Sequence, residues 1–462
     1  MRITWEILEQ GEIERMDREA RRILETTGLE VFHRGLRDLL RRRGARVEGE
    51  RVRFPGGMID GALKAAPGTF SLYEVSGQER AVAPGAGYFS VYSDGLFISE
   101  PGAERLRPST KQDVADFAAL GQTLAMVDIV PNACHARDCP EPGQLLHTAE
   151  ALLSNTTKLV SFAPQNARQA EVFHEMVGIA SEGRANPGRP AWKGCVSTTS
   201  PLRLDRDSGE VLLFLAGNRI PFITAPCPMC GGTSPFSLTG TLLLQTAENL
   251  ALIAMAQAAA EGTPIVMGGA AGPMDMRTGA LAYGAPERSL LIGANNQIQR
   301  FYGLPTHSAS ISINSWLSDV QTGLERELIV FTRMLYRPNF WGGAGAMCSG
   351  KAVSLAQALI DCHAVEMTGR YLRGIDTRDS VWGAESIERV GPGGDFMTDP
   401  LTMELMRSGE MWYSSLTNME EDRGKPMVDR AQEEVRRILE DFRSPVKEGV
   451  RENLRRYVER AN

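Results

Sequence analysis

The chain has 462 residues, 42% of them hydrophobic and 23% charged, and a formal net charge of −7. This composition is that of a globular protein with a large core. No segment interleaves basic and aromatic residues, so nucleic acid and anionic membranes are poor candidate partners. The seven cysteines are odd in number and scattered, and we expect free thiols in a reducing compartment.

Two segments could be mistaken for targeting or membrane elements. The first 25 residues mix acids and bases at helical spacing and lack the apolar region of a secretory signal, which favours a cytoplasmic protein. The most apolar segment, Leu242–Ala260, is interrupted by polar residues such as Gln245 and Glu248. It therefore predicts a buried helix and not a membrane span.

Residues 1–84 predict an N-terminal cap on the rest of the molecule. An amphipathic helix is expected over Glu12–Thr27 and a shorter one over Leu36–Arg42. Residues 376–462 predict a helical C-terminal extension, whose charges alternate in sign as on solvated helix faces or an oligomer contact.

Between these ends, short β-rich runs alternate with helical segments, the pattern of βα units around a parallel sheet. The eight predicted strands are Tyr88–Tyr92, Val127–Pro131, Leu159–Phe162, Ala191–Ser197, Pro221–Ala225, Pro264–Gly268, Leu304–Ser308 and Asn339–Gly342. The eight predicted helices begin near Ser109, Gln144, Ala167, Ser208, Leu238, Pro286, Asp319 and Lys351.

Several of these helices carry terminal signals. Ser109 with Gln112 and Ser318 with Gln321 are spaced as capping boxes, and Pro286 suits a first helical turn. Gly262 and Gly303 suit helix C-termini.

Eight such units predict a (β/α)₈ barrel over residues 85–375, in the α/β class. An open doubly wound sheet would also alternate strands and helices, but it should show a glycine-rich phosphate loop after its first strand. None follows Tyr88–Tyr92. The glycine pairs 231–232, 268–269 and 342–343 match no phosphate-binding motif and are interpreted as turns at the barrel mouth.

Barrel active sites lie at the C-terminal ends of the strands, so the residues that follow each strand are the candidate binding residues. Those proposed to bind substrate are Tyr92, Asn132, Gln165, Thr198, His307, Trp316 and Trp341, with Met229 and Met274 also at the mouth. Because these are aromatic, thioether, amide or hydroxyl side chains and one histidine, the mouth suits a cation better than proton transfer. His307 could equally be a hydrogen-bonded structural residue, and no catalytic residue is assigned.

A charged cluster of Asp275, Arg277 and Glu287 follows the sixth strand and predicts an ion-pair network in a long mouth loop. Cys227 and Cys230 have the spacing of half a zinc knuckle, with Cys134, His135 and Cys139 as the nearest possible partners. That pairing is irregular, so we expect no metal. A zinc-dependent methyltransferase acting on a thiol or alcohol remains the alternative.

Five segments in order resemble the trimethylamine methyltransferase family. The most specific is MDMRTGALAYGAPE at 274–287, followed by SLTGTLLLQTAENLALIAMAQ at 237–257. Weaker matches are LLSNTTKLV at 152–160, DVQTGLE at 319–325 and GAMCSGKAVSLAQALID at 345–361.

The resemblance implies methyl transfer from a methylated amine to the Co(I) corrinoid (cobalamin-type) cofactor of a partner protein, within a TIM barrel. The chain contains only standard residues, so it looks like the branch without pyrrolysine, which acts on quaternary amines such as glycine betaine. A histidine often stands near the end of strand eight in that branch. Trp341 stands in this region here, which argues against glycine betaine itself.

Displacement at a quaternary ammonium releases a neutral tertiary amine, so no acid is needed, and an aromatic mouth would suffice to hold and align the cation. We expect a homo-oligomer. A paralogue that binds a quaternary amine without turning it over is a second alternative.

Overall fold

The computed structural model describes residues 5–103, 105–186, 188–417 and 424–461. A curled parallel sheet stands at its centre, with neighbouring strands in the order β15-β13-β11-β10-β9-β6-β17. Its strands are β6 (Tyr88–Val91), β9 (Ile129–Pro131), β10 (Leu159–Ser161), β11 (Trp192–Val196), β13 (Phe222–Thr224), β15 (Ile265–Met267) and β17 (Phe340–Ala344).

Residues 304–308 close the sheet into a barrel. Thr306 makes a parallel bridge to Met267 of β15, and His307 makes one to Phe340 of β17. This segment therefore occupies the place of the seventh strand, and all eight predicted strand positions are confirmed.

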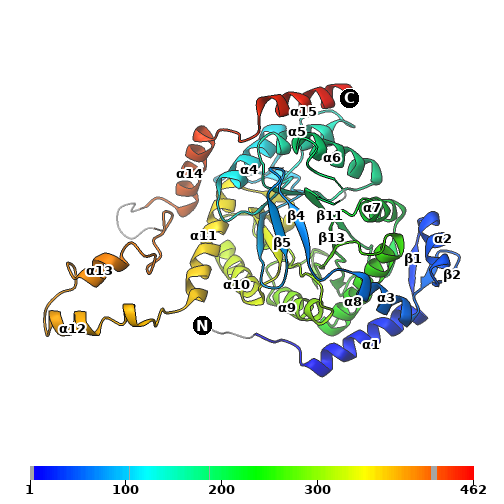
Figure 1. Cartoon of the computed structure of the whole chain (residues 1–462), viewed down its shortest axis with the longest axis horizontal. Coiled ribbons are helices and arrows are strands. Elements are labelled where there is room, and N and C mark those ends of the chain that lie inside the picture. The colour runs from blue at the N-terminus through cyan, green and yellow to red at the C-terminus, as the bar shows by residue number, and fades with distance from the viewer. Residues whose placement is uncertain (1–4, 104, 187, 418–423, 462) are drawn as a thin grey trace.

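Eight helices surround the barrel, as predicted, and Figure 1 shows them as a ring around the central strands. They are α4 (Lys111–Thr123), α5 (Gln144–Leu153), α6 (Ala167–Ala180), α7 (Arg206–Gly217), α8 (Leu238–Ala259), α9 (Pro286–Phe301), α10 (Val320–Tyr336) and α11 (Leu355–Arg373). By length and composition α8 could cross a membrane, but 78% of its most apolar window is buried inside the protein. The prediction that this segment is a buried helix is confirmed.

The two predicted capping boxes, Ser109 with Gln112 and Ser318 with Gln321, are wrong. The capping box of α4 is formed by Thr110 and Asp113, one residue later than predicted. At α10 the N-cap is Asp319, whose carboxylate accepts from the Thr322 N–H. In both cases the residue after the predicted serine is the N-cap, since threonine and aspartate also serve as N-caps.

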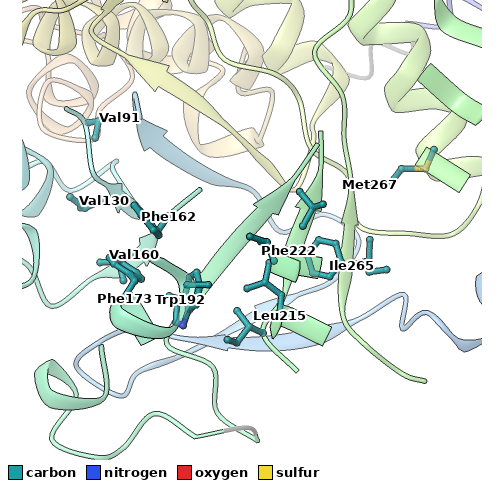
Figure 2. Close-up of a cluster of buried hydrophobic side chains, with 14 of the residues drawn as sticks. Val91, Val130, Val160, Phe162, Phe173, Trp192, Leu215, Phe222, Ile265 and Met267 are labelled. Carbon is teal, nitrogen blue, oxygen red and sulfur yellow. The ribbon is translucent and has the colours of Figure 1, made fainter. Parts of the chain in front are cut away.

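The barrel strands are buried on both faces, which explains their apolar sequences. On the outer face, Phe173 of α6 packs between Phe162 and Trp192, at ring-centroid distances of 4.6 and 5.2 Å. Figure 2 shows this layer, in which Val160, Trp192, Phe222 and Leu215 meet between strands and helices. The inner face has a smaller apolar cluster that includes Tyr88, Ile223 and Phe340.

The N-terminal segment packs mainly on α8, outside the ring, and sends one hairpin across the end of the barrel (Figure 1). It holds α1 (Gln10–Thr26), β1 (Leu29–Val31), α2 (Arg34–Arg42), β2 (Arg46–Glu48), β3 (Arg51–Arg53), α3 (Gly56–Ala65) and the hairpin β4 (Phe70–Tyr73) and β5 (Glu79–Val82). Leu72 and Val82 of the hairpin belong to the inner apolar cluster, so the hairpin closes the floor of the barrel. In Figure 1 the hairpin crosses the centre of the ring.

The opposite end carries short strands in the βα loops. These are β7 (Phe97–Ile98), β8 (Arg107–Pro108), β14 (Met229–Cys230), β16 (Gly272–Pro273), β18 (Ala346–Met347) and β19 (Ala352–Val353), with the turn η1 (Cys348–Gly350); β12 (Arg203–Leu204) pairs with β1. The six short strands from β7 to β19 named first, together with η1, form the rim of the barrel mouth.

The C-terminal segment is helical, with η2 (Asp379–Val381), α12 (Ala384–Val390), α13 (Pro400–Leu405), α14 (Met427–Asp441) and α15 (Glu448–Ala461). α14 packs on α11 and α4, and α15 packs on α5 and α6. The part with α12 and α13 extends away from the barrel (Figure 1).

Candidate functional site

A cavity of about 240 Å³ lies inside the barrel, toward the C-terminal ends of the strands. It is the hollow expected of a barrel active site. Larger hollows, such as the 650 Å³ groove beside Trp5 and Phe301, lie outside the barrel. The polar or ionisable side chains that line the cavity are Ser90, Tyr92, Ser93, Asp94, Ser161, Lys193, Cys195, His307, Ser308 and Ser310.

Lys193 is the most unusual of these residues. It lies on β11 with 7% of its surface exposed, and its Nζ is 5.6 Å from the centre of the Phe340 ring on β17. Among the described residues, none forms an ion pair or a hydrogen bond with this ammonium group. Burial lowers the pKa of Lys193 to about 8, so the group is still mostly charged at neutral pH.

His307 comes from the seventh strand position, where its backbone N–H bonds to Met267. Its Nδ1 is buried and has no hydrogen-bond partner in the described structure. Burial lowers the pKa of His307 to about 3, and the nearby Lys193 charge acts in the same direction. The predicted residue therefore lines the cavity as a neutral imidazole.

Asp94 lies at the rim of the cavity, in the turn that follows β6. Its backbone has φ +65°, a left-handed conformation that aspartate tolerates better than most residues. Asn132 donates from Nδ2 to Asp94 Oδ1 at 2.9 Å, and His135 Nε2 lies 3.4 Å from the same oxygen. The predicted residue Asn132 thus orients a carboxylate that lines the cavity.

Tyr92 forms part of the cavity wall, as predicted, and donates from its hydroxyl to the Gly350 carbonyl at 3.0 Å. Burial raises the pKa of Tyr92, so the phenol stays protonated. Behind it, the buried Arg288 lies 4.6 Å from the Tyr283 ring and donates to the Ser310 carbonyl at 3.1 Å. This arginine holds the loop after the seventh strand in place.

Two further predicted residues lie near the mouth without lining the cavity. Thr198 is buried and donates to Glu248 Oε2 at 2.8 Å, as does Ser200 at 2.7 Å, so it belongs to a structural network beneath the loop. The Gln165 side chain is exposed. Met229 and Met274 are half-buried in the rim, on and next to the β14–β16 pair.

The two predicted aromatic residues are not brought together. Trp341 lies on the helix-facing side of β17 and packs against Phe89 at 4.7 Å, away from the cavity. Trp316 is 58% exposed in the loop before α10. A cage made of these two rings is not present, because adjacent strand residues face opposite sides of the sheet.

The predicted ion-pair network is only partly present. Arg277 pairs with Asp275 at 3.2 Å, and both residues lie in the loop after β16. Glu287 is exposed in the first turn of α9 and forms no ion pair with described residues. The buried charge of this region is the neighbouring Arg288, which the sequence does not distinguish from a surface residue.

The described residues contain no group of three or more His, Cys, Asp or Glu side chains arranged to hold a metal ion. Cys227 donates from Sγ to the Ala270 carbonyl at 3.2 Å, and Cys230 is buried beside it. Burial raises the pKa of Cys227, which favours its neutral thiol form. These two cysteines have the environment of ordinary core thiols.

Lys193, Asp94 and Cys195 line the cavity although the sequence did not single them out. Asp94 could have been noticed, since the Asp-Gly pair at 94–95 follows a strand directly. Lys193 interrupts an otherwise apolar strand segment, AWKGCV at 191–196, and a charge inside such a strand is rare unless it is used.

A closed parallel barrel with a polar cavity at its C-terminal end defines a protein of the (β/α)₈-barrel class, in which that end carries the active site. Comparison of the sequence with known families identifies the family within this class. The model of the trimethylamine methyltransferase family matches residues 2–462, and the chain belongs to this family. The assignment as a methyltransferase follows from this membership.

Curated relatives agree with the family assignment. The chain is 30% identical over 402 residues to a glycine betaine methyltransferase of Desulfitobacterium hafniense strain Y51, covering 86% of this chain and 84% of the relative. It is 27% identical over 447 residues to a trimethylamine methyltransferase of the same species, covering 95% and 90%.

The fold also resembles a solved structure. The monomethylamine methyltransferase of Methanosarcina barkeri aligns with a TM-score of 0.50 at 13% identity, covering 94% of this chain and 89% of that one. This likeness supports the barrel architecture.

Proposed function

We propose that this protein transfers a methyl group from a small quaternary amine of the betaine type to the Co(I) corrinoid of a partner protein. The observation that carries the proposal is the polar cavity at the barrel mouth, in a chain that belongs to the trimethylamine methyltransferase family. Its size suits a small ligand, and its opening lies on the face where barrel enzymes bind their substrates.

The titratable groups of the cavity fit this chemistry. His307 is neutral, and burial raises the pKa of both Tyr92 and Cys195. A quaternary ammonium leaves as a neutral tertiary amine, so the protein has no proton to deliver. A reduced corrinoid supplies the nucleophile when its carrier docks. The role of the barrel is then to desolvate the ammonium and align one N–CH₃ bond with the opening.

The rim of the mouth supports docking of a carrier protein. Phe236, Met276, Trp316 and Leu317 are exposed there by 76%, 63%, 58% and 60%. Exposed apolar residues that gather on a surface mark interaction sites. In this proposal Trp316 contacts the corrinoid protein and not the substrate.

We also infer that the protein is a cytoplasmic homo-oligomer. The segment with α12 and α13 exposes Trp382, Met397 and Met406 by 66%, 79% and 58%, and a second copy would cover such side chains. Light scattering coupled to size exclusion should give a multiple of the 50.5 kDa chain mass. A mass of one chain at micromolar concentration would refute the oligomer.

The activity is tested by anaerobic incubation with cob(I)alamin and a panel of quaternary amines, following the spectrum of methylcobalamin. Ser161→Leu should abolish formation of methylcobalamin, because Ser161 lines the cavity. Glu171→Leu adds a similar side chain on the exposed surface of α6 and should keep the rate. Absence of methylcobalamin with every amine would refute the proposal, and an unchanged rate in Ser161→Leu would refute the assigned site.

A further inference from the structure

The cavity contains two polar groups that have no hydrogen-bond or ion-pair partner among the described residues. One is the Lys193 ammonium, carried by a side chain more than nine-tenths buried. The other is Nδ1 of His307, which is buried and accepts or donates no hydrogen bond among the described residues. Both side chains line the same cavity, and Lys193 is near enough to His307 to lower its pKa.

An unpaired buried cation is costly, and such groups are normally paired or hydrogen-bonded. Lys158 of the same chain shows how the ammonium of a structural lysine obtains hydrogen-bond partners. Its Nζ donates to the carbonyls of Gly121, Leu124 and Val127 at 2.6 to 2.9 Å. Lys193 has no equivalent partners in the described structure. A bound anionic group would supply such a partner.

We infer that Lys193, together with His307, binds the carboxylate of a zwitterionic substrate, an inference that rests on the proposed function. An ammonium and an imidazole N–H are both donors to a carboxylate oxygen. A quaternary ammonium without a carboxylate would bring a second positive charge into this cavity and would leave the Lys193 ammonium without an anionic partner. The substrate class is thus narrowed to N-methylated amino acids.

The positions of the charged groups also give the substrate an orientation. The Lys193 ammonium lies near the ring of Phe340, which belongs to the inner apolar cluster. That cluster forms the floor side of the cavity. Asp94 follows the C-terminal end of β6 and lies on the mouth side. A zwitterion with its carboxylate at Lys193 has its ammonium toward Asp94. Its methyl groups then face the opening, where the acceptor docks.

The experiment compares ligands that differ in charge but little in shape. Calorimetric affinities are measured for glycine betaine, proline betaine and carnitine, and for the methyl ester of each. Wild type should bind the preferred zwitterion roughly 10- to 100-fold more tightly than its ester. In Lys193→Met this ratio should fall to near one. The ester should also bind the variant more tightly than it binds wild type, because the repulsion is removed.

Lys158→Met is the matched control, since it removes a half-buried lysine whose ammonium donates to backbone carbonyls outside the cavity, and it should leave the ratio unchanged. An ester bound by wild type as tightly as the zwitterion, or a wild-type ratio in Lys193→Met, would overturn the inference. Methyl transfer to cob(I)alamin from choline or tetramethylammonium but from no zwitterion would overturn it, while methyl transfer from a quaternary amine to a corrinoid would still stand. Zwitterion binding with this ratio but without methyl transfer would refute the proposed function alone.

Discussion

At the residue scale, we expect Lys193 to affect the stability of the protein as well as binding. Burial lowers its pKa from the ordinary 10.5 to about 8 in the folded protein. Between these pH values the unfolded chain binds more protons, so the free energy of unfolding of the wild type should rise with pH through this window. Below pH 8 the full cost of burying the charge is present.

Lys193→Met should therefore be more stable than wild type at pH 7, by on the order of 1 to 3 kcal/mol, because it removes an unpaired buried charge and keeps the volume. Urea unfolding at pH 7 and pH 10 measures this difference, which should shrink at the higher pH. A variant less stable than wild type at pH 7 would mean that Lys193 has a partner within the protein.

The two mouth tryptophans should respond differently to truncation. Trp341 packs against Phe89 between the barrel and its helices, so Trp341→Ala should cost about 3 kcal/mol of unfolding free energy. Trp316 is mostly exposed, and Trp316→Ala should change stability by less than about 0.5 kcal/mol. It should instead weaken docking of the corrinoid protein. Thermal unfolding of both variants checks this, and an equal loss in the two would contradict the placement of Trp341.

Only some of the cavity residues could be predicted from the sequence. Tyr92 and His307 were placed at the cavity because each follows or ends a strand that could be located. Trp341 was predicted at the mouth but faces the helices, and Lys193, which lines the cavity, was not predicted. A strand buried on both faces has no alternation of polar and apolar residues to show which side chains point inward. Because adjacent residues of a strand face opposite sides, an error of one residue places a side chain in the cavity when it faces the helices, or the reverse.

At the scale of single elements, the start of α4 carries a testable electrostatic contact. Although burial opposes it, hydrogen bonds from Arg107 and Thr110 lower the pKa of Asp113. A lowered carboxyl pKa gives stability that is present above the ordinary value of 3.8 and is lost as the pH falls through the folded value. Asp113→Asn should then cost about 1 to 3 kcal/mol at pH 7 and progressively less below pH 4.

Asp116→Asn on the same helix is the matched control, because burial raises the pKa of Asp116. This substitution should cost little at pH 7. Chemical denaturation of both variants between pH 3 and pH 7 compares them, and a loss for Asp113→Asn that does not depend on pH would contradict the assignment.

A second element-scale test concerns the closure between β6 and β17. Gly342 has φ +146°, and a Cβ at this position would lie 2.3 Å from the Ser90 carbonyl oxygen. Gly342→Ala should force the first and eighth strands apart and destabilise the barrel by more than about 3 kcal/mol. Soluble expression and thermal unfolding measure this, and wild-type stability would show that the two strands can separate without cost.

At the scale of the whole molecule, the barrel could be predicted because eight βα units follow one another with capped or glycine-terminated helices. The detailed arrangement of the ends could not. The β4–β5 hairpin that closes the floor is set by contacts of Leu72 and Val82 with strands far away in the chain, and such long-range packing leaves no local pattern. The same holds for the exposed segment around α12 and α13.

The central claim is that this molecule moves an intact methyl group from a quaternary ammonium to cobalt. The most direct measurement uses a betaine labelled with ¹³C in its N-methyl groups, incubated anaerobically with chelator-treated enzyme and cob(I)alamin and followed by NMR. We expect a ¹³C signal of cobalt-bound methyl and the N,N-dimethyl product to appear in equal amounts. A demethylated product without labelled methylcobalamin, or a reaction that requires added zinc, would contradict it.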